Sequence, residues 1–164
     1  MPNIKPISDL RNYSEVLHDV AVGAPVFLTK NGRGRYAIVD MQDYERTQAT
    51  IRLMNELAKG RHSGEAEGWL TPNKIHYSPE SRRDLDDIWD YIVSELQNRS
   101  AAERVINRII DAVDPLKNFA EMGTPLSSIA DIGTDYRFLV SGNYMVFYRV
   151  QGNDIYIDRV LYGR

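Results

Sequence analysis

Arginine and tyrosine side chains gather toward the C-terminal end of the chain: Arg137, Arg149, Arg159, Tyr162 and Arg164. Cleavage of RNA needs a base for the 2′-hydroxyl and a cation for the charge that develops on the phosphate. Tyr162, Arg164 and Arg137 are the candidates for those roles. A tyrosine with its ordinary pKa near ~10 is, however, a poor general base at neutral pH. The arginines therefore predict a basic surface that binds nucleic acid or a protein target. The alternative is that they pair with the aspartates of a nearby helix.

A second group of cations lies near the N-terminus. It comprises Arg11, Lys30, Arg33 and Arg35, with Asn31 in the turn between them. Such side chains contact phosphates and base edges, and glycine in the turn lets backbone amides approach phosphates closely. The group predicts DNA binding from one face of a dimer, against the alternative of ordinary surface charge.

An aromatic residue, Trp69, stands at the end of the glycine-rich stretch 60–68. An exposed indole in such a stretch is unfavourable unless it docks. We therefore expect Trp69 and its neighbour Leu70 to be anchors. His76 is interpreted as structural. No spacing indicates metal ligands, a Ser/His/Asp set or a nucleotide-binding loop, and no cofactor is expected.

The composition limits the class of protein. The 164 residues suit one domain or two small ones, and a hydrophobic content of 43% can fill a core. There are no cysteines, and no apolar run reaches the ~20 residues of a membrane span, so we expect a cytoplasmic protein. Residues 1–72 contain 9 Lys and Arg and 9 Asp and Glu, whereas residues 73–164 contain 11 Lys and Arg and 14 Asp and Glu. DNA contact must therefore come from a local patch.

The elements that position these residues form two α+β patterns. The first reads as βαββα: a strand at 3–7, a helix from Ser8 to Gly23, strands at 25–29 and 35–39 around an Asn-Gly turn, and a second helix from Asp43. Glycine, serine and charge at 60–68 indicate a linker. We therefore expect a domain at 1–59, a linker and arm at 60–72, and a second domain at 73–164.

The second pattern begins with a strand at 74–77. A helix follows with Ser78 as N-cap and Pro79 in its first turn, and it carries Asp84, Asp86, Asp87 and Asp90 on its outer side. Residues 101–119 predict a second amphipathic helix, so the two should pack as an αα-hairpin. Strands at 136–140, 144–150 and 155–161 are spaced as hairpins and predict an antiparallel sheet.

Two independent resemblances follow from these motifs. Residues 8–13, 24–32 and 36–39 resemble the Phd/YefM antitoxin family. Residues 77–80, 84–92, 136–140, 143–149 and 160–164 resemble the RelE/ParE toxin superfamily, and the helix Asp-Leu-x-x-Ile-Trp-x-Tyr-Ile is similar to its ParE branch. Family antitoxins continue past Gly-Trp-Leu into a further short helix, where this chain has Pro72 and Asn73. Many family toxins have histidine at the position of Tyr162.

The resemblance implies a fused toxin–antitoxin module. The first domain would form a homodimer, with a higher oligomer left open, bind operator DNA and repress its own transcription. The arm would neutralise the toxin in cis or in trans, with Trp69 and Leu70 as anchors and Glu65 and Glu67 as partners of toxin arginines.

The resemblance to the ParE branch implies that the toxin binds DNA gyrase and performs no chemistry. Two alternatives remain: a ribosome-dependent mRNA endonuclease, which would be an enzyme, and an inactive toxin retained in a dimeric repressor.

Overall fold

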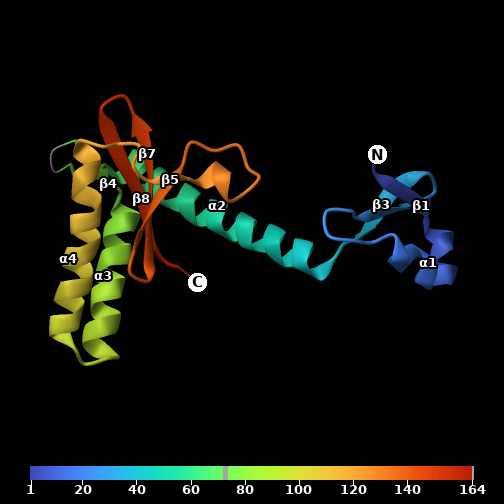
Figure 1. Cartoon of the computed structure of the whole chain (residues 1–164), viewed down its shortest axis with the longest axis horizontal. Coiled ribbons are helices and arrows are strands. Elements are labelled where there is room, and N and C mark those ends of the chain that lie inside the picture. Colours follow the sequence, from blue (N-terminus) through green and yellow to red (C-terminus); the bar gives the residue numbers. More distant parts are fainter. Residues whose placement is uncertain (72–73, 164) are drawn as a thin grey trace. The chain divides into compact units, whose positions relative to one another are not determined.

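The computed structural model describes residues 1–71 and 74–163. It divides the chain into two compact units, Met1–Leu53 and Met54–Arg164 (Figure 1). A single long helix, α2 (Met41–Glu67), contributes its first half to the N-terminal unit and its second half to the C-terminal unit. Each unit is described by itself.

The N-terminal unit has the predicted βαββα order. Its elements are β1 (Asn3–Pro6), η1 (Ile7–Asn12), α1 (Tyr13–His18), β2 (Val26–Lys30), β3 (Arg33–Ile38) and the start of α2. The strands form a sheet in the order β1-β2-β3, with β1 parallel and β3 antiparallel to β2. Its core is small and consists of Val16, Val26 and Leu28, with Val20 and Ile38 packed against them.

The first helix is shorter than predicted. The chain enters a 3₁₀ turn at Ile7, and an α-helix forms only over Tyr13–His18. Ser8 is not its N-cap: Pro6 holds that position for the 3₁₀ turn and makes no capping bond. The Asn-Gly turn is as predicted, since Asn31 and Gly32 have φ of 54° and 73°, the left-handed pair of a tight hairpin.

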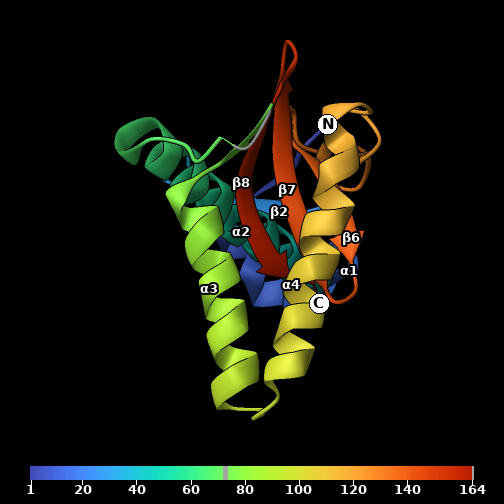
Figure 2. The ribbon, with the colours of Figure 1, turned by 90° about the vertical axis from the view of Figure 1, so that its left-hand side faces the viewer.

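The C-terminal unit packs a helical hairpin on one face of a sheet, as predicted (Figure 2). The strands run in the order β4-β8-β7-β6-β5, and only the pairing of β4 with β8 is parallel. The elements are β4 (Ile75–Tyr77), α3 (Pro79–Ser94), α4 (Arg99–Val113), η2 (Asp114–Lys117), β5 (Thr124–Pro125), η3 (Leu126–Ser128), β6 (Arg137–Ser141), β7 (Tyr144–Gln151) and β8 (Asp154–Tyr162).

Helix α3 begins as its sequence predicts. The Ser78 side chain accepts a hydrogen bond from the Ser81 amide, and Pro79 occupies the first turn. The expectation that Asp84 lies on the outer side was wrong. Asp84 is buried with Ile88 and Ile92 because it pairs with an arginine of β8.

The interpretation of residues 60–68 as a linker was also wrong for most of its length. Helix α2 continues to Glu67, and Gly60, Ser63 and Gly64 are buried within it. Glycine disfavours a helix interior by about 1 kcal/mol relative to alanine. Here it is retained because the helix packs against the sheet of the C-terminal unit more closely than a residue with a Cβ atom allows.

Candidate functional site

The face of the sheet opposite α3 and α4 carries charged side chains, and a β-bulge places two of them. Phe147 pairs with Arg159, whereas the next residue, Tyr148, pairs with Ile157, so Asp158 is the extra residue of β8. A bulge re-aims the side chains next to it. Asp158 and Arg159 can therefore both turn toward this face although they are consecutive in the strand.

Asp158 is fully buried and holds Arg149 of the neighbouring strand. The Arg149 Nε donates to Asp158 Oδ2 at 2.6 Å, and its Nη2 donates to Oδ1 at 3.2 Å. The Arg149 side chain is only 3% exposed. Burial raises the pKa of Asp158, and the guanidinium of Arg149 opposes that shift.

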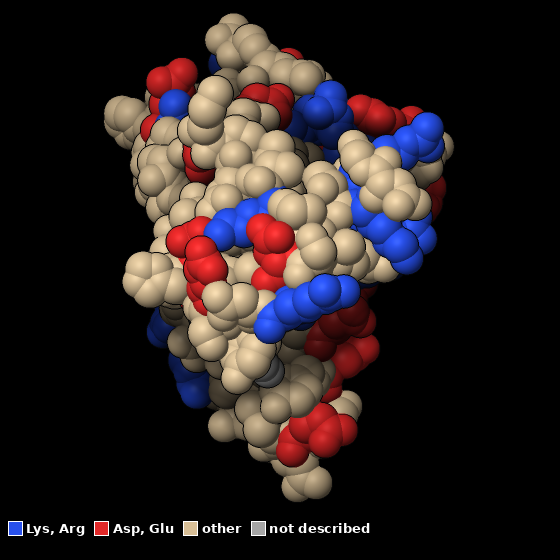
Figure 3. All heavy atoms as spheres, turned by 90° about the vertical axis from the view of Figure 1, so that its right-hand side faces the viewer, with Lys and Arg blue, Asp and Glu red and all other residues tan. Residues whose placement is uncertain are grey.

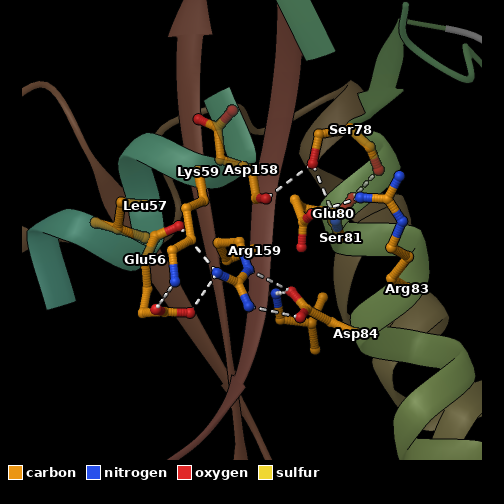
Figure 4. A network of polar contacts seen from close by, with 12 residues as sticks. Glu56, Leu57, Lys59, Ser78, Glu80, Ser81, Arg83, Asp84, Asp158 and Arg159 are labelled. Atoms are coloured by element: carbon orange, nitrogen blue, oxygen red, sulfur yellow. Dashed lines mark hydrogen bonds and ion pairs between the residues drawn. The ribbon is translucent and has the colours of Figure 1, made fainter. Parts of the chain in front are cut away.

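Arg159 forms a second buried centre, which joins three elements (Figure 4). Its Nε and Nη2 donate to the two carboxylate oxygens of Asp84 in α3, each at 2.8 Å. Its Nη1 donates to the Glu56 carboxylate at 2.6 Å and to the Glu56 carbonyl at 3.0 Å. Burial lowers the pKa of Arg159, but the bonds to Asp84 and Glu56 outweigh it and raise that pKa. The hydrogen bond from Lys59, and then that from Arg159, lowers the pKa of Glu56.

Residues 54–71, which we call the docked segment, cover this sheet face. Leu57 is fully buried. A Cβ atom added to Gly60 would lie 2.0 Å from the Asp158 carbonyl oxygen and 2.8 Å from the Arg159 Cδ. Because real Cβ atoms do not approach backbone so closely, only glycine fits there.

The indole of Trp69 folds back under the end of α2. A Cβ atom on Gly64 would meet that ring at 2.2 Å. The ring stands edge-on to Tyr156 with centroids 4.9 Å apart, and the guanidinium of Arg149 lies 6.0 Å from its centre. Tyr156 in turn stacks on His76 at 4.6 Å. Trp69 is therefore docked in an aromatic seat beside a buried cation.

Polar contacts hold the C-terminal end of the docked segment. The backbone groups of Leu70 and Tyr77 exchange hydrogen bonds of 2.9 and 2.7 Å, while Leu70 as a whole residue stays 52% exposed. The ring of His76 lies 2.7 Å from the Thr71 hydroxyl and 3.0 Å from an Asp154 carboxylate oxygen.

The amide of Glu80, in the first turn of α3, donates to the hydroxyl of Ser63 at 3.1 Å. Of the two glutamates predicted to reach arginines of the second domain, Glu67 pairs with Arg83 of α3 at 3.0 Å. Glu65 instead pairs with Arg61 of its own helix at 3.1 Å.

Family comparisons identify both sides of this contact. Residues 75–164 match the family model described as the ParE toxin of the type II toxin–antitoxin system parDE. The chain belongs to the ParE toxin family. Residues 2–72 match the model of the Phd/YefM antitoxin of type II toxin–antitoxin systems. The chain is thus an antitoxin segment followed by a toxin segment. The docked segment belongs to the former and the sheet face to the latter.

A solved structure titled "Chromosomal ParDE TA system from P. aeruginosa" is 25% identical, covers 53% of this chain and 91% of its own, and has a TM-score of 0.46. No curated protein matches the chain.

The arginines predicted to form an exposed basic face of the toxin segment do not form one here. Arg149 and Arg159 are buried in ion pairs, and Arg159 pairs with a helix aspartate as the alternative interpretation held. Arg137 donates to the carbonyls of Glu121 and Gly123 at 3.1 and 2.9 Å. Arg164 lies outside the described residues, as do Pro72 and Asn73 of the predicted arm.

Tyr162 lines a pocket of about 540 Å³ together with Asp87, Ile88, Tyr91 and Tyr144. Its ring stands edge-on to Tyr144 at 5.6 Å. Among the described residues, those lining the pocket include no cation that could stabilise a phosphate.

The predicted DNA-binding residues all lie exposed on the N-terminal unit. Lys30, Arg33 and Arg35 lie within the β2–β3 hairpin, and Arg11 lies in the 3₁₀ turn. None of these four cations makes an ion pair with another described residue. Arg11 shares a shallow hollow of about 290 Å³ with two acidic residues, Asp9 and Glu15. Figure 3 shows basic side chains at the right of this view and others at its centre and left, with acidic ones beside them.

Sequence reasoning missed several residues of the site: Glu56, Gly60, Gly64, Asp84 and Asp158. The spacing of the two glycines was an available signal, since residues four apart share one helix face. The described residues contain no group of His, Asp and Glu that could hold a metal ion. No described helix is both long enough and apolar enough to cross a membrane.

Proposed function

We propose that this chain is a self-regulated toxin–antitoxin module. Its antitoxin segment binds operator DNA as a homodimer and represses its own transcription. Its toxin segment inhibits DNA gyrase once the docked segment leaves the sheet. The observation that carries the proposal is the burial of the toxin sheet face by residues 54–71.

The docked segment and the toxin segment belong to one compact unit of one chain. The hydrogen bonds between Leu70 and Tyr77 turn the segment back onto β4 within a few residues. Because so short a connection gives the segment a very high effective concentration at its seat, neutralisation is expected in cis.

The surface of the N-terminal unit supports dimerisation and DNA binding. Large apolar side chains remain exposed on it, among them Ile4 (59%), Tyr13 (64%), Leu17 (51%) and Tyr36 (50%). Apolar side chains gathered on so small a unit favour a protein interface. The exposed cations of the β2–β3 hairpin are free to contact phosphates in the same unit.

The geometry favours binding over RNA cleavage as the toxin's activity. The proton carrier of the nuclease alternative, Tyr162, lies in a pocket without a described cation. Arg149 and Arg159 are each held by a carboxylate of the toxin segment itself, and Arg137 of β6 donates to two backbone carbonyls. Among the residues that the structure describes, neither arrangement brings together a base and a free cation, which RNA cleavage requires.

The test uses the full chain with Gly60→Leu, which removes the space that the docked segment needs. The matched control is Ala58→Leu, at an exposed position of the same helix. We expect growth arrest with a DNA-damage response from Gly60→Leu only, and inhibition of gyrase supercoiling by the purified variant. Translation arrest with cleaved messenger RNA would instead establish the endonuclease. Unimpaired growth with Gly60→Leu and an undocked segment would establish the inactive toxin.

A further inference from the structure

Charged groups beneath the docked segment stabilise the packing of a helix less effectively than apolar side chains would. Replacing a buried ion pair by apolar residues of similar volume is often neutral or stabilising. Yet this face buries Arg149 with Asp158 and Arg159 with Asp84, although a surface on which a helix packs needs only apolar side chains. Such groups are useful if the face has a second state in which it is uncovered and binds something else.

The charges of the face indicate what that ligand is. Each guanidinium is matched by one carboxylate of the toxin segment, so the four groups sum to zero before Glu56 arrives. A nucleic-acid backbone is bound by neutralising many phosphates with unpaired cations. Among the described residues, Arg159 reaches the docked segment through Nη1, which donates to a single carboxylate, that of Glu56, and to the carbonyl of the same residue. The face therefore fits a single acidic side chain better than a polyanion.

The second feature of the face is a seat for a ring. Trp69 fills it, edge-on to Tyr156 and 6.0 Å from the Arg149 guanidinium. Tyr136 and Tyr156 lie 5.8 and 5.5 Å from that same cation. An edge-on contact with tyrosine and the field of a buried cation favour an aromatic side chain, which is a common anchor of protein interfaces.

We propose that the sheet face beneath residues 54–71 is where the toxin segment recognises a protein target. Glu56 and Trp69 occupy the places of an acidic and an aromatic side chain of that target. The proposal rests on the proposed function, in which the toxin acts by binding after the segment undocks. It explains why docking silences the toxin, since segment and target compete for the same groups.

The tyrosine pocket of Asp87, Tyr91, Tyr144 and Tyr162 is the rival target surface. None of its lining residues belongs to the docked segment, and Tyr91 and Tyr162 are 56% and 58% exposed while the segment is docked. A target that used this pocket would be bound whether or not the segment had undocked. Docking could then not control the toxin.

The first experiment measures the chemistry of the face directly. The full chain with Gly60→Leu and Trp69→Ala is titrated with a fluorescein-labelled peptide of residues 54–71. We expect saturable binding, weakened about tenfold or more by Glu56→Gln or Trp69→Ala in the peptide. An unlabelled RNA oligonucleotide should not displace the peptide. Displacement by the oligonucleotide, or equal binding of the three peptides, would overturn the proposal.

The second experiment measures target recognition in cells, using the same opened chain. Adding Tyr156→Ala should abolish growth arrest, Tyr156→Phe should restore it, and Tyr91→Ala should leave it unchanged. Circular dichroism confirms that each variant is folded, and an unfolded Tyr156→Ala is replaced by Tyr156→Leu. Arrest that survives loss of the Tyr156 ring but disappears with Tyr91→Ala would refute this face as the target site. An opened chain that never arrests growth would refute the proposed function instead.

Discussion

Substituting Gly60 by alanine tests the close approach of α2 to β8 with a single methyl group. The new Cβ would lie 2.0 Å from the Asp158 carbonyl oxygen, whereas ordinary contact begins at 3.4 Å. The helix must therefore retreat by roughly 1.4 Å from backbone that is fixed in the sheet. That distance is enough to break the hydrogen bonds of 2.6 and 3.0 Å from Arg159 to Glu56.

Opposing effects decide whether Gly60→Ala strengthens or weakens docking of the segment. Alanine favours the helix interior over glycine by about 1 kcal/mol. Retreat of the helix uncovers Leu57, whose burial contributes about 1.5–3 kcal/mol. It also removes hydrogen bonds to a charged group, which contribute about 1.5–3 kcal/mol. We expect a net loss of about 2–5 kcal/mol in the free energy that holds the segment docked, so the undocked population rises by roughly 30-fold or more.

Hydrogen exchange of the amides of residues 54–67 measures this local opening without requiring the whole chain to unfold in one step. Ala58→Gly is the control because Ala58 is exposed in the same helix, and it should lower protection by about 1 kcal/mol through helix propensity alone. Gly60→Ala should lower protection by more than this control. If Gly60→Ala raised protection instead, propensity would outweigh sterics and the close contact would be refuted.

Three further predictions concern the anchors, the acid sensitivity and the DNA face. Trp69→Ala in the full chain should cause growth arrest on induction. Leu70→Ala should not, because Leu70 is held through its backbone. Equal effects of the two substitutions would contradict the docking of the Trp69 indole. The bonds from Lys59 and Arg159 lower the pKa of Glu56 below its ordinary 4.5, so its contribution to docking is present above that value and is lost as the pH falls through the lowered pKa. Amide protection of residues 54–67 should accordingly decline below about pH 4.5, and the decline should be smaller in Glu56→Gln. Arg33→Ala with Arg35→Ala should weaken operator binding and reduce the slope of log affinity against log salt concentration by about 1 per phosphate contact. Substitution of the exposed Arg104 by alanine should leave both quantities unchanged. An unaltered slope in the double variant would exclude the β2–β3 hairpin as the DNA-binding surface.

Local patterns in the sequence were sufficient for the two folds and most elements. Hairpin spacing of the last three strand patterns predicted β6, β7 and β8, and Ser78 with Pro79 predicted the start of α3. The motifs of both halves also indicated the two families that the comparisons show. These signals are readable because capping, turn geometry and amphipathic spacing depend on residues only a few positions apart.

The candidate site needed tertiary structure because its contacts join residues far apart in the chain. Arg159 reaches Asp84 and Glu56, which lie 75 and 103 positions away. Whether Arg159 is exposed or buried could not be inferred from the residues next to it in sequence, because a bulge in β8 sets the direction of its side chain. Gly60 and Gly64 read as helix breakers in sequence, since glycine lowers helix propensity. In the folded chain they lie where Asp158 and Trp69 leave no room for a Cβ, so packing across the segment overrides propensity within it.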